Sequence, residues 1–329
     1  MRDTLLVLVP GFSFLSLGCI LEPLRYAQAL TSGGKAKVEV YDLAGGSSQS
    51  QAGFTLCGAG TLAELETRLL GKANADAIFF CCGFDVEKDV REPLRRLMRL
   101  ARRCGIPIYG LGAATWALAE TDLLPNRIGV VHWSSLSAFK ERNLDITPLP
   151  KLYCPDPKVT TCAGELATLD LIVHFVIQTF GKPIADQMCD RFLIARPRGP
   201  ETDQPQHTAS LLRYAPPLLH AVVSRMTKNL EHPLRVDSLA AEAGVSQRQL
   251  ERLFARYLGA SPRKFYHQLQ LALAWQLCEQ TDLTLTEIAF ASGFSTVSGL
   301  SRKFRDGYQI SPSELRARSR GRKTAHPER

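Results

Sequence analysis

The sequence predicts an α/β domain followed by an all-α domain. Over the first part, continuous apolar runs alternate with amphipathic stretches of helical period, the pattern of a parallel sheet with helices on both faces. After about residue 211 no strand pattern appears, and short helical stretches are separated by Gly, Ser and Pro. With 329 residues, 45% of them hydrophobic, the chain can form two cores of this kind.

The elements of the α/β domain follow one another as strand, helix, strand. The expected strands are 4–9, 38–43, 77–82, 106–111 and 159–162. The expected helices are 20–30, 62–70, 87–103, 115–120 and 165–180. Because the strand runs lack polar alternation, both of their faces are expected to be buried. This predicts a flavodoxin-like domain.

The apolar segment 5–21 has two other interpretations, a signal peptide and a membrane span. Pro10, Gly11 and Ser13 interrupt it, so a buried strand followed by a turn and a helix start fits better. The nine cysteines contain no CxxC pair and no His/Cys ligand spacing. We therefore expect no metal site, but reduced, buried thiols in a cytosolic protein.

Charge divides the chain into a neutral and a basic part. Residues 1–210 contain 22 Lys or Arg and 22 Asp or Glu, whereas residues 211–329 contain 18 and 10, so the net charge of +8 falls in the last third. A basic module joined to a neutral one is typical of DNA binding, although a basic tail without a binding role is an alternative. The Pro-rich stretch RPRGPETDQPQ at 196–206 indicates a linker, which we place at 196–214.

The basic part contains an internal repeat. SLAAEAGVS at 238–246 resembles EIAFASGFS at 287–295, at an offset of 49 residues. LERLF at 250–254 resembles LSRKF at 300–304, at an offset of 50, so the second copy has one added residue. Two copies separated by a long helix, over about 262–280, are far more specific than one. A single copy resembles any helical hairpin that contains a glycine.

Each copy has the features of a helix-turn-helix. Gly244 and Gly293 follow a short helix, where a positive φ permits a sharp turn. An apolar residue comes next and can fill the gap between the two helices. Ser246 or Ser295 then suits the N-cap of the second helix.

The second helix of each copy has a polar, basic face opposite its apolar one. Gln and Arg can make bidentate contacts to base edges, and the other side chains can reach bases or phosphates. The residues expected to contact DNA are Ser246, Gln247, Arg248, Gln249 and Arg252 in the first copy, and Ser295, Thr296, Ser298, Arg302 and Lys303 in the second. The long helix can place both copies in successive major grooves, about 34 Å apart. A purely protein-binding helical domain is the alternative.

With this repeat, residues 218–316 resemble the AraC/XylS family of DNA-binding domains throughout. The most specific stretch is LTLTEIAFASGFSTVSGLSRKFRDGYQISPSELR at 283–316. The family usually has a histidine or similar residue where Gly299 stands, which leaves the base preference of that helix open. The resemblance implies a DNA-binding domain over 215–318, a basic tail at 319–329, and double-stranded DNA and RNA polymerase as partners.

Residues 1–195 resemble the PfpI-like, class I glutamine-amidotransferase-like fold. The resembling stretches occur in the expected order: VLVPGFSFLSLGCILEPLRYA, GLGAATWALAETDLL, VVHW and VTTCAGELATLDLIVHF. Ahead of an AraC-type domain, this fold implies a GlxA-type regulator. Its first domain is then expected to sense a small ligand and to form a homodimer.

The catalytic relatives of this fold carry a cysteine on a tight turn between a strand and a helix, where backbone N–H groups stabilise an oxyanion. By resemblance this position is Gly112, followed by Ala113 and Ala114. Without a thiolate no acyl intermediate can form, so we expect no enzyme activity and no cofactor. The alternative is an active PfpI-like amidase or hydrolase fused to a DNA-binding domain.

The resemblance also implies a ligand pocket at this turn, lined by Glu22, Gly112, Ala113, Trp116, His132 and Trp133. A carboxylate beside aromatic rings suits a small cation, which gains about 0.5–2 kcal/mol over an aromatic face. Regulators of this type respond to quaternary amines such as glycine betaine or carnitine, or to amino acids such as arginine. The plainer interpretations are a surface carboxylate for Glu22, a structural hydrogen bonder for His132 and core packing for the tryptophans.

Together these features predict a cytoplasmic transcription activator of a catabolic operon, with no membrane association. A small amine or amino acid would shift the homodimer toward its active arrangement. Two alternatives stay open. A repressor would use the same DNA contacts, and an architectural protein would bind DNA without a signal.

Overall fold

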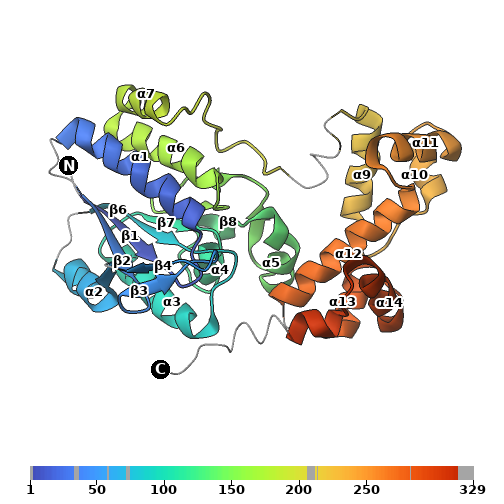
Figure 1. Ribbon diagram of the computed structural model, residues 1–329, viewed down its shortest axis with the longest axis horizontal. Coiled ribbons are helices and arrows are strands. Elements are labelled where there is room, and N and C mark those ends of the chain that lie inside the picture. Colours follow the sequence, from blue (N-terminus) through green and yellow to red (C-terminus); the bar gives the residue numbers. More distant parts are fainter. Residues whose placement is uncertain are drawn as a thin grey trace. The chain divides into compact units, whose positions relative to one another are not determined.

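In the computed structural model, the chain divides into two units, residues 1–204 and residues 205–329 (Figure 1). The structure describes residues 3–32, 37–57, 59–71, 75–205, 212, 214–281 and 283–317. The expected basic tail at 319–329 lies outside these residues. Over the described residues, no helix combines the length and the hydropathy needed to span a membrane.

The first unit has the predicted α/β architecture. Its main sheet has the strand order β10-β11-β7-β6-β1-β2-β5 and is parallel except for β10. The strands are β1 (Asp3–Leu8), β2 (Val38–Asp42), β5 (Gly60–Thr61), β6 (Ala75–Cys81), β7 (Ile108–Leu111), β10 (Tyr153–Cys154) and β11 (Val159–Cys162). Two small sheets pair β3 (Ser47–Gln49) with β4 (Thr55–Cys57) and β8 (Ile128–Val130) with β9 (Thr147–Leu149).

Helices cover both faces of this sheet (Figure 1). They are α1 (Phe14–Ser32), α2 (Leu62–Leu70), α3 (Lys88–Arg103), α4 (Ala114–Ala119), α5 (Leu136–Arg142), α6 (Ala167–Phe180) and α7 (Lys182–Arg191). In β1, Leu5 and Val7 pack into the core under α2, α3 and α4, whereas Leu6 and Leu8 pack under α1, α6 and α7. This two-sided burial is the reason why the strands are apolar along their whole length.

Helix α1 begins six residues earlier than the sequence predicts. The side chain of Ser13 accepts a hydrogen bond from the N–H of Ser16 at 3.1 Å, and its carbonyl accepts one from Leu17 at 3.0 Å. Ser13 therefore caps the first turn of the helix. As a result, the start of α1 lies next to the end of β1.

The ends of the parallel strands form one edge of the sheet. The chain passes from β2 and β5 on one side of β1 to β6 on its other side, so the order of connection reverses between β1 and β6. In such sheets ligands bind outside the carboxyl ends of the strands, at the reversal point. The turns that follow β1, β6, β7 and β11 meet at this edge.

The first unit continues past the expected boundary at 195. Arg198 donates three hydrogen bonds to the carboxylate of Asp170, at 2.6–3.0 Å. The amide of Gln204, which is only 6% exposed, donates to the carbonyls of Val131 and Lys151. These contacts hold the proline-rich segment on the domain. Most of the remaining expected linker, 206–211 and 213, lies outside the described residues.

The described residues of the second unit form helices joined by turns and contain no strand, as predicted. Its helices are α9 (Pro217–Lys228), α10 (Val236–Glu242), α11 (Gln247–Leu258), α12 (Pro262–Gln280), α13 (Leu285–Ala291) and α14 (Val297–Tyr308). Helix α12 has 19 residues and is about 28 Å long. Phe265 near its start packs against Phe254 of α11, and Trp275 near its end stacks on Phe304 of α14. Helix α12 thus joins two helix pairs.

Replacing Gln204 by leucine should destabilise the first unit. The substitution leaves the N–H of Trp133 and the carbonyls of Val131 and Lys151 without their 2.7 Å partners, and each buried polar group without a partner costs about 1–3 kcal/mol. We expect the free energy of unfolding, followed by tryptophan fluorescence in urea, to fall measurably. Glu201→Gln is the control, since its side chain is 95% exposed. Equal stability of the two variants would contradict the prediction.

Candidate functional site

Two helix-turn-helix units are present in the second unit of the chain. Helices α10 and α11 form the first, and Gly244 between them has a φ of 69°. Helices α13 and α14 form the second, where Gly293 has a φ of 78°. Both angles lie in the left-handed region, which glycine adopts without strain. The predicted turn chemistry is therefore present in both copies.

The two recognition helices are capped differently. Ser246 caps α11, since its hydroxyl accepts from the N–H of Gln249. Helix α14 is capped by Thr296, whose hydroxyl accepts from the N–H of Gly299 at 3.1 Å. The prediction of Ser295 as this cap is wrong, because the residue added in the second copy moves the helix start by one position.

Each recognition helix exposes a row of polar side chains. Arg248 and Arg252 lie one turn apart on α11, and Ser298 and Arg302 occupy the corresponding positions of α14; all four are exposed. The opposite face of each helix is fully buried, at Leu250 and Phe254 in α11 and at Leu300 and Phe304 in α14. Both copies therefore present the same two positions, fifty residues apart, to the exterior.

Other residues predicted to contact DNA form contacts within the protein. The side-chain oxygen of Gln249 accepts from the N–H of Ser246, so a bidentate contact to adenine would require this capping bond to open. The amide of Gln247 donates to Glu251 at 3.0 Å. Lys303 is half-buried, and its charge acts on His267 of α12. Of the second-copy residues, Ser295 and Thr296 are exposed at the start of α14.

Glu251, which was not among the residues predicted to contact DNA, is exposed one residue before Arg252. A carboxylate beside such arginines can accept a hydrogen bond from the N4 amine of cytosine. Glu251 comes four residues, about one helical turn, after Gln247, so both lie on the same side of α11. This spacing is visible in the sequence and could have identified Glu251. Arg256 also continues the row begun by Arg248 and Arg252, one turn further along α11.

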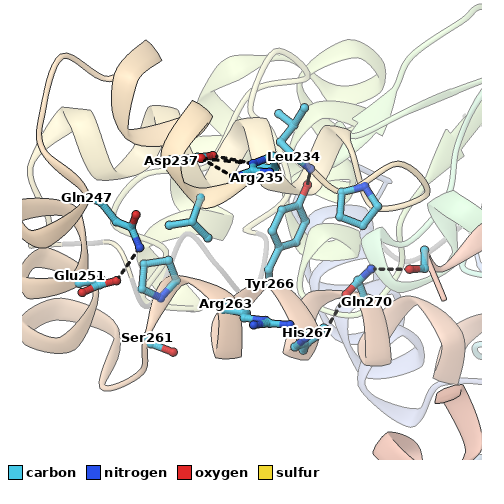
Figure 2. Close-up of a pocket in the computed structure, with 14 residues that line it drawn as sticks. Leu234, Arg235, Asp237, Gln247, Glu251, Ser261, Arg263, Tyr266, His267 and Gln270 are labelled. Atoms are coloured by element: carbon cyan, nitrogen blue, oxygen red, sulfur yellow. Dashed lines mark hydrogen bonds and ion pairs between the residues drawn. The ribbon is translucent and has the colours of Figure 1, made fainter. Parts of the chain in front are cut away.

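A groove of about 780 Å³ lies beside α11 (Figure 2). It is bounded by the start of α10, one side of α11 and the first half of α12. Arg235 pairs with Asp237 at one wall, and Arg263 and His267 project from α12 (Figure 2). Burial lowers the pKa of His267, and the positive charges of Lys303 and Arg263 act in the same direction.

Gln270 joins the turn of the second helix-turn-helix to the loop that precedes the first. Its side chain is only 2% exposed and lies in the middle of α12. Its amide donates to the carbonyl of Leu230, between α9 and α10, at 3.4 Å and to that of Gly293, in the turn of the second unit, at 3.2 Å. Its oxygen lies 2.9 Å from Nδ1 of His267. A Cβ at Gly293 would lie 2.1 Å from the carbonyl oxygen of Leu230, so this close approach requires glycine.

In the first unit, the turn after β7, which we call the elbow (residues 112–114), has no room for a side chain at its first residue. Gly112 has a φ of 60°, and a Cβ there would lie 2.6 Å from the carbonyl oxygen of Gly83. The N–H of Ala113 donates to the same oxygen at 2.9 Å. The N–H of Gly112 donates to the carbonyl of Cys162 at 3.0 Å. Neither N–H is thus free to stabilise an oxyanion.

The other residues predicted at the elbow fall into two groups. His132 lies close to it: its ring is 5.1 Å from that of Phe84 and 5.4 Å from that of Trp133. Trp116 instead packs against Phe139 of α5, at 4.9 Å, within the core under α3 and α4. For Trp116 the core interpretation therefore fits the contacts better.

The predicted carboxylate is misplaced. Glu22 is exposed on α1, six residues beyond Ser16, which amounts to about 9 Å along the helix. Ser16 accepts from the N–H of Glu165 at 2.8 Å, and Glu165 directly follows Gly164. A Cβ on Gly164 would lie 3.3 Å from Cα of Gly112. The carboxylate beside the elbow is therefore Glu165, on the turn after β11.

The thiols near the elbow are unsuited to nucleophilic attack. Burial raises the pKa of Cys162 to about 12 and that of Cys82 well above its ordinary value. Both side chains are buried, and thiolate is the reactive form. All nine cysteines are free, but Cys57 and Cys104 are exposed, so the prediction of buried thiols is only partly right.

Comparisons with known proteins agree with both halves of the chain. A family model described as a helix-turn-helix domain matches residues 239–318. The chain is 31% identical over 316 residues to the HTH-type transcriptional regulator CdhR of Pseudomonas aeruginosa, covering 96% of this chain and 92% of that protein. It is also 31% identical over 320 residues to the HTH-type transcriptional regulator GlxA of Rhizobium meliloti, covering 95% of each.

A solved structure supports the fold of the first unit. The crystal structure of an AraC family transcriptional regulator from Pseudomonas putida matches with a TM-score of 0.51 and 19% identity. The match covers 58% of this chain and all of that one. At this identity the likeness shows the fold alone.

Replacing Gln270 by leucine should loosen the second unit. The carbonyls of Leu230 and Gly293 would lose their shared donor, at about 1–3 kcal/mol for each buried group. We expect a lower free energy of unfolding and weaker binding to duplexes that contain both half-sites. Gln268→Leu, at an exposed position of the same helix, is the matched control. If both variants unfold and bind like the wild type, Gln270 does not join the two units.

Adding a methyl group at Gly112 should lower the free energy of unfolding more than the same change at a glycine with open space around it. Gly112 and Gly105 both have a positive φ, a backbone conformation that is about 1–2 kcal/mol less favourable for alanine than for glycine. Only at Gly112 would the new Cβ meet a carbonyl oxygen; Gly105 has open space around it. Gly112→Ala should therefore lower the unfolding midpoint in urea further than Gly105→Ala. Equal midpoints would show that the elbow has room for a side chain.

Proposed function

The chain belongs to the GlxA-type transcriptional regulators of the AraC/XylS family, and we propose that it activates a catabolic operon by binding a defined promoter sequence. The observation that carries the DNA-binding part is the repeated pair of exposed positions on two capped helices, Arg248 with Arg252 and Ser298 with Arg302. Side chains of this kind read base edges in the major groove. The basic second part of the chain adds attraction to phosphates.

Helix α12 is the element that would set the spacing of the two half-sites. Its contacts with Phe254 and Phe304 lie ten residues apart, at Phe265 and Trp275, or about 15 Å along the helix axis. To reach successive turns of duplex, about 34 Å apart, the two recognition helices would have to project outward and away from each other from these contact points. Arg263 and His267 on the same helix would then face the backbone between the two half-sites.

In this proposal, the first unit binds a small amine or an amino-acid-like effector and catalyses no reaction on it. The support is physical. Gly112 has no side chain and no room for one, the N–H groups of Gly112 and Ala113 are occupied, and the thiols of Cys82 and Cys162 are held protonated by burial. We expect a cytoplasmic homodimer in which the effector shifts the population toward the arrangement that recruits RNA polymerase.

An active amidase or hydrolase fused to a DNA-binding domain is the second candidate. It needs a nucleophile and an oxyanion site, and the described residues of the elbow offer neither in a usable form. A thiol-directed probe separates the two possibilities. Strong labelling of one cysteine of the first unit at neutral pH would favour the enzyme, whereas slow labelling confined to the exposed Cys57 and Cys104 would support a binding role.

Removing one arginine from either recognition helix should weaken specific binding. Sites are first selected from a random duplex library with the wild-type protein. On the selected site, Arg252→Ala and Arg302→Ala should each lose about 1–3 kcal/mol and relax the preference at the base pair they contact. Arg225→Ala removes the same charge from α9, where Arg225 pairs with Glu242, and should leave the preference unchanged.

Affinity is measured at fixed salt by fluorescence anisotropy, because phosphate contacts make binding strongly salt-dependent. Failure of the selection to enrich any sequence would indicate an architectural protein. Enrichment followed by wild-type affinity in both recognition-helix variants would contradict the assignment of these two side chains.

A further inference from the structure

The first unit ends in a segment, residues 198–204, that we call the strap. It runs antiparallel to residues 150–152, which precede β10 at the edge of the main sheet. The N–H of Leu152 donates to the carbonyl of Thr202 at 3.0 Å. The second unit begins directly after the strap, at Pro205. The strap is therefore the last part of the first unit before the chain enters the DNA-binding unit.

The end of the strap holds the segment that carries His132. The side-chain amide of Gln204 donates to the carbonyl of Val131 at 2.7 Å, and its oxygen accepts from the N–H of Trp133, also at 2.7 Å. These two residues flank His132, whose ring packs against Phe84 beside the elbow. Because one strap residue is bonded on both sides of His132, a shift of His132 and a shift of the strap are expected to occur together.

The start of the strap is bonded to the helix that begins beside the elbow. Arg198 donates to the carboxylate of Asp170 through its backbone N–H and through its guanidinium. Asp170 is only 7% exposed and lies in the first turn of α6, shortly after Gly164 and Glu165. A buried carboxylate is costly without its partner. Both ends of the strap are thus bonded to segments that border the elbow.

A row of backbone hydrogen bonds also leads from the elbow to the strap. The N–H of Gly112 donates to the carbonyl of Cys162 at 3.0 Å. The next residue, Ala163, donates to the carbonyl of Leu152 at 2.9 Å, and Leu152 donates in turn to Thr202. Two segments, one at the end of β11 and one before β10, therefore lie between the elbow and the strap.

Polar contacts, with little apolar burial, keep the strap in place. Of residues 198–204 only Gln204 is buried, and none has an apolar side chain larger than that of proline. A hydrogen bond contributes little net free energy to folding, because water competes for the same groups. Segments with few buried apolar contacts open while the rest of a domain stays folded. The strap can therefore dock and release without unfolding of the first unit.

From these contacts we propose that the strap couples the elbow to the DNA-binding unit. Ligand binding at the elbow and docking of the strap stabilise each other, because both order residues 131–133 and the first turn of α6. Release of the strap lengthens the chain that joins the two units. The length of such a chain sets how readily the two DNA-binding units of a dimer occupy two sites at once. The inference rests on the proposed function, in which a homodimer responds to a ligand at the elbow.

A disulfide formed after Lys151→Cys and Asp203→Cys would lock the strap in its docked position. These residues form an antiparallel pair flanked by hydrogen bonds, and Cα atoms in such pairs are about 4.5 Å apart, within the range of a disulfide. The exposed Cys57 and Cys104 and the half-buried Cys154 are replaced by serine in this background. Peptide mapping verifies the bond, and the reduced form of the same protein is the control.

Hydrogen exchange of the full chain tests the coupling to the elbow. Gln204→Leu is the released variant. Peptides that cover 108–116 and 160–168 should exchange about threefold faster or more in Gln204→Leu than in the oxidised, locked protein, with the reduced protein between them. Peptides from α2, which packs beside β5 at the opposite edge of the sheet, should exchange alike in all three.

Equal exchange at the elbow in the three proteins would overturn the coupling. Should Gln204→Leu fail to fold, Asp203→Lys takes its place, because Asp203 is exposed and the variant sets two like charges opposite each other at the strap.

Anisotropy titrations with the selected DNA site test the effect on DNA binding. On a duplex with two copies of the site for one subunit, the locked protein should bind about two- to ten-fold more tightly than the released variant. On a duplex with one copy, the two proteins should bind equally. Equal affinities on both duplexes, or a difference on the single-copy duplex as well, would overturn the inference and leave DNA binding intact. If the selection enriches no sequence, the proposed function fails and the effect of the strap on DNA binding fails with it, whereas unequal exchange would still support its coupling to the elbow.

Discussion

The double helix-turn-helix depends on one buried amide in the middle of a long helix. Gln270 bonds at once to the loop between α9 and α10 and to the turn before α14, so this loop and this turn cannot move apart without leaving two carbonyls without their donor. The aromatic contacts of Phe265 and Trp275 fix the same helix at its two ends. Under the proposed function, reading two successive grooves would require a fixed spacing, and a satisfied buried polar contact fixes one arrangement more specifically than apolar packing alone does.

Backbone crowding plays the corresponding role in the first unit. At the elbow the carbonyl of Gly83 occupies the space that a side chain on Gly112 needs, and it also takes up the N–H of Ala113. The described residues of the elbow thus hold neither a nucleophile nor a free N–H group at Gly112 or Ala113. At the same edge of the sheet, Glu165 has a left-handed backbone conformation.

Sequence reasoning succeeded at the elbow and recognition helices only where a local rule applied. Gly244 and Gly293 mark turns, and Arg248 with Arg252 repeats at helical spacing; both follow from neighbouring residues alone. It failed for Ser295, where a one-residue insertion moved the cap, and it did not foresee that the side chain of Gln249 accepts a hydrogen bond from Ser246 at the start of its own helix. Glu22 was also chosen over Glu165, because the sequence does not show which of the two carboxylates lies beside the elbow after β7.

The sequence by itself determined the alternation of the five central strands β1, β2, β6, β7 and β11 with helices, the repeat, the charge division and the absence of a nucleophile at residue 112. These are properties of periodicity and of residue type, and they act over a few neighbours. Only the tertiary structure decided that Gln270 joins two turns, that Gly112 has no room for a side chain and that Glu165 lies at the elbow. These contacts join segments far apart in the sequence: Gln270 and Gly293 are 23 residues apart, and Ser13 and Glu165 are 152 residues apart. Their pairing follows from how the sheet and the helices pack, which no local pattern encodes.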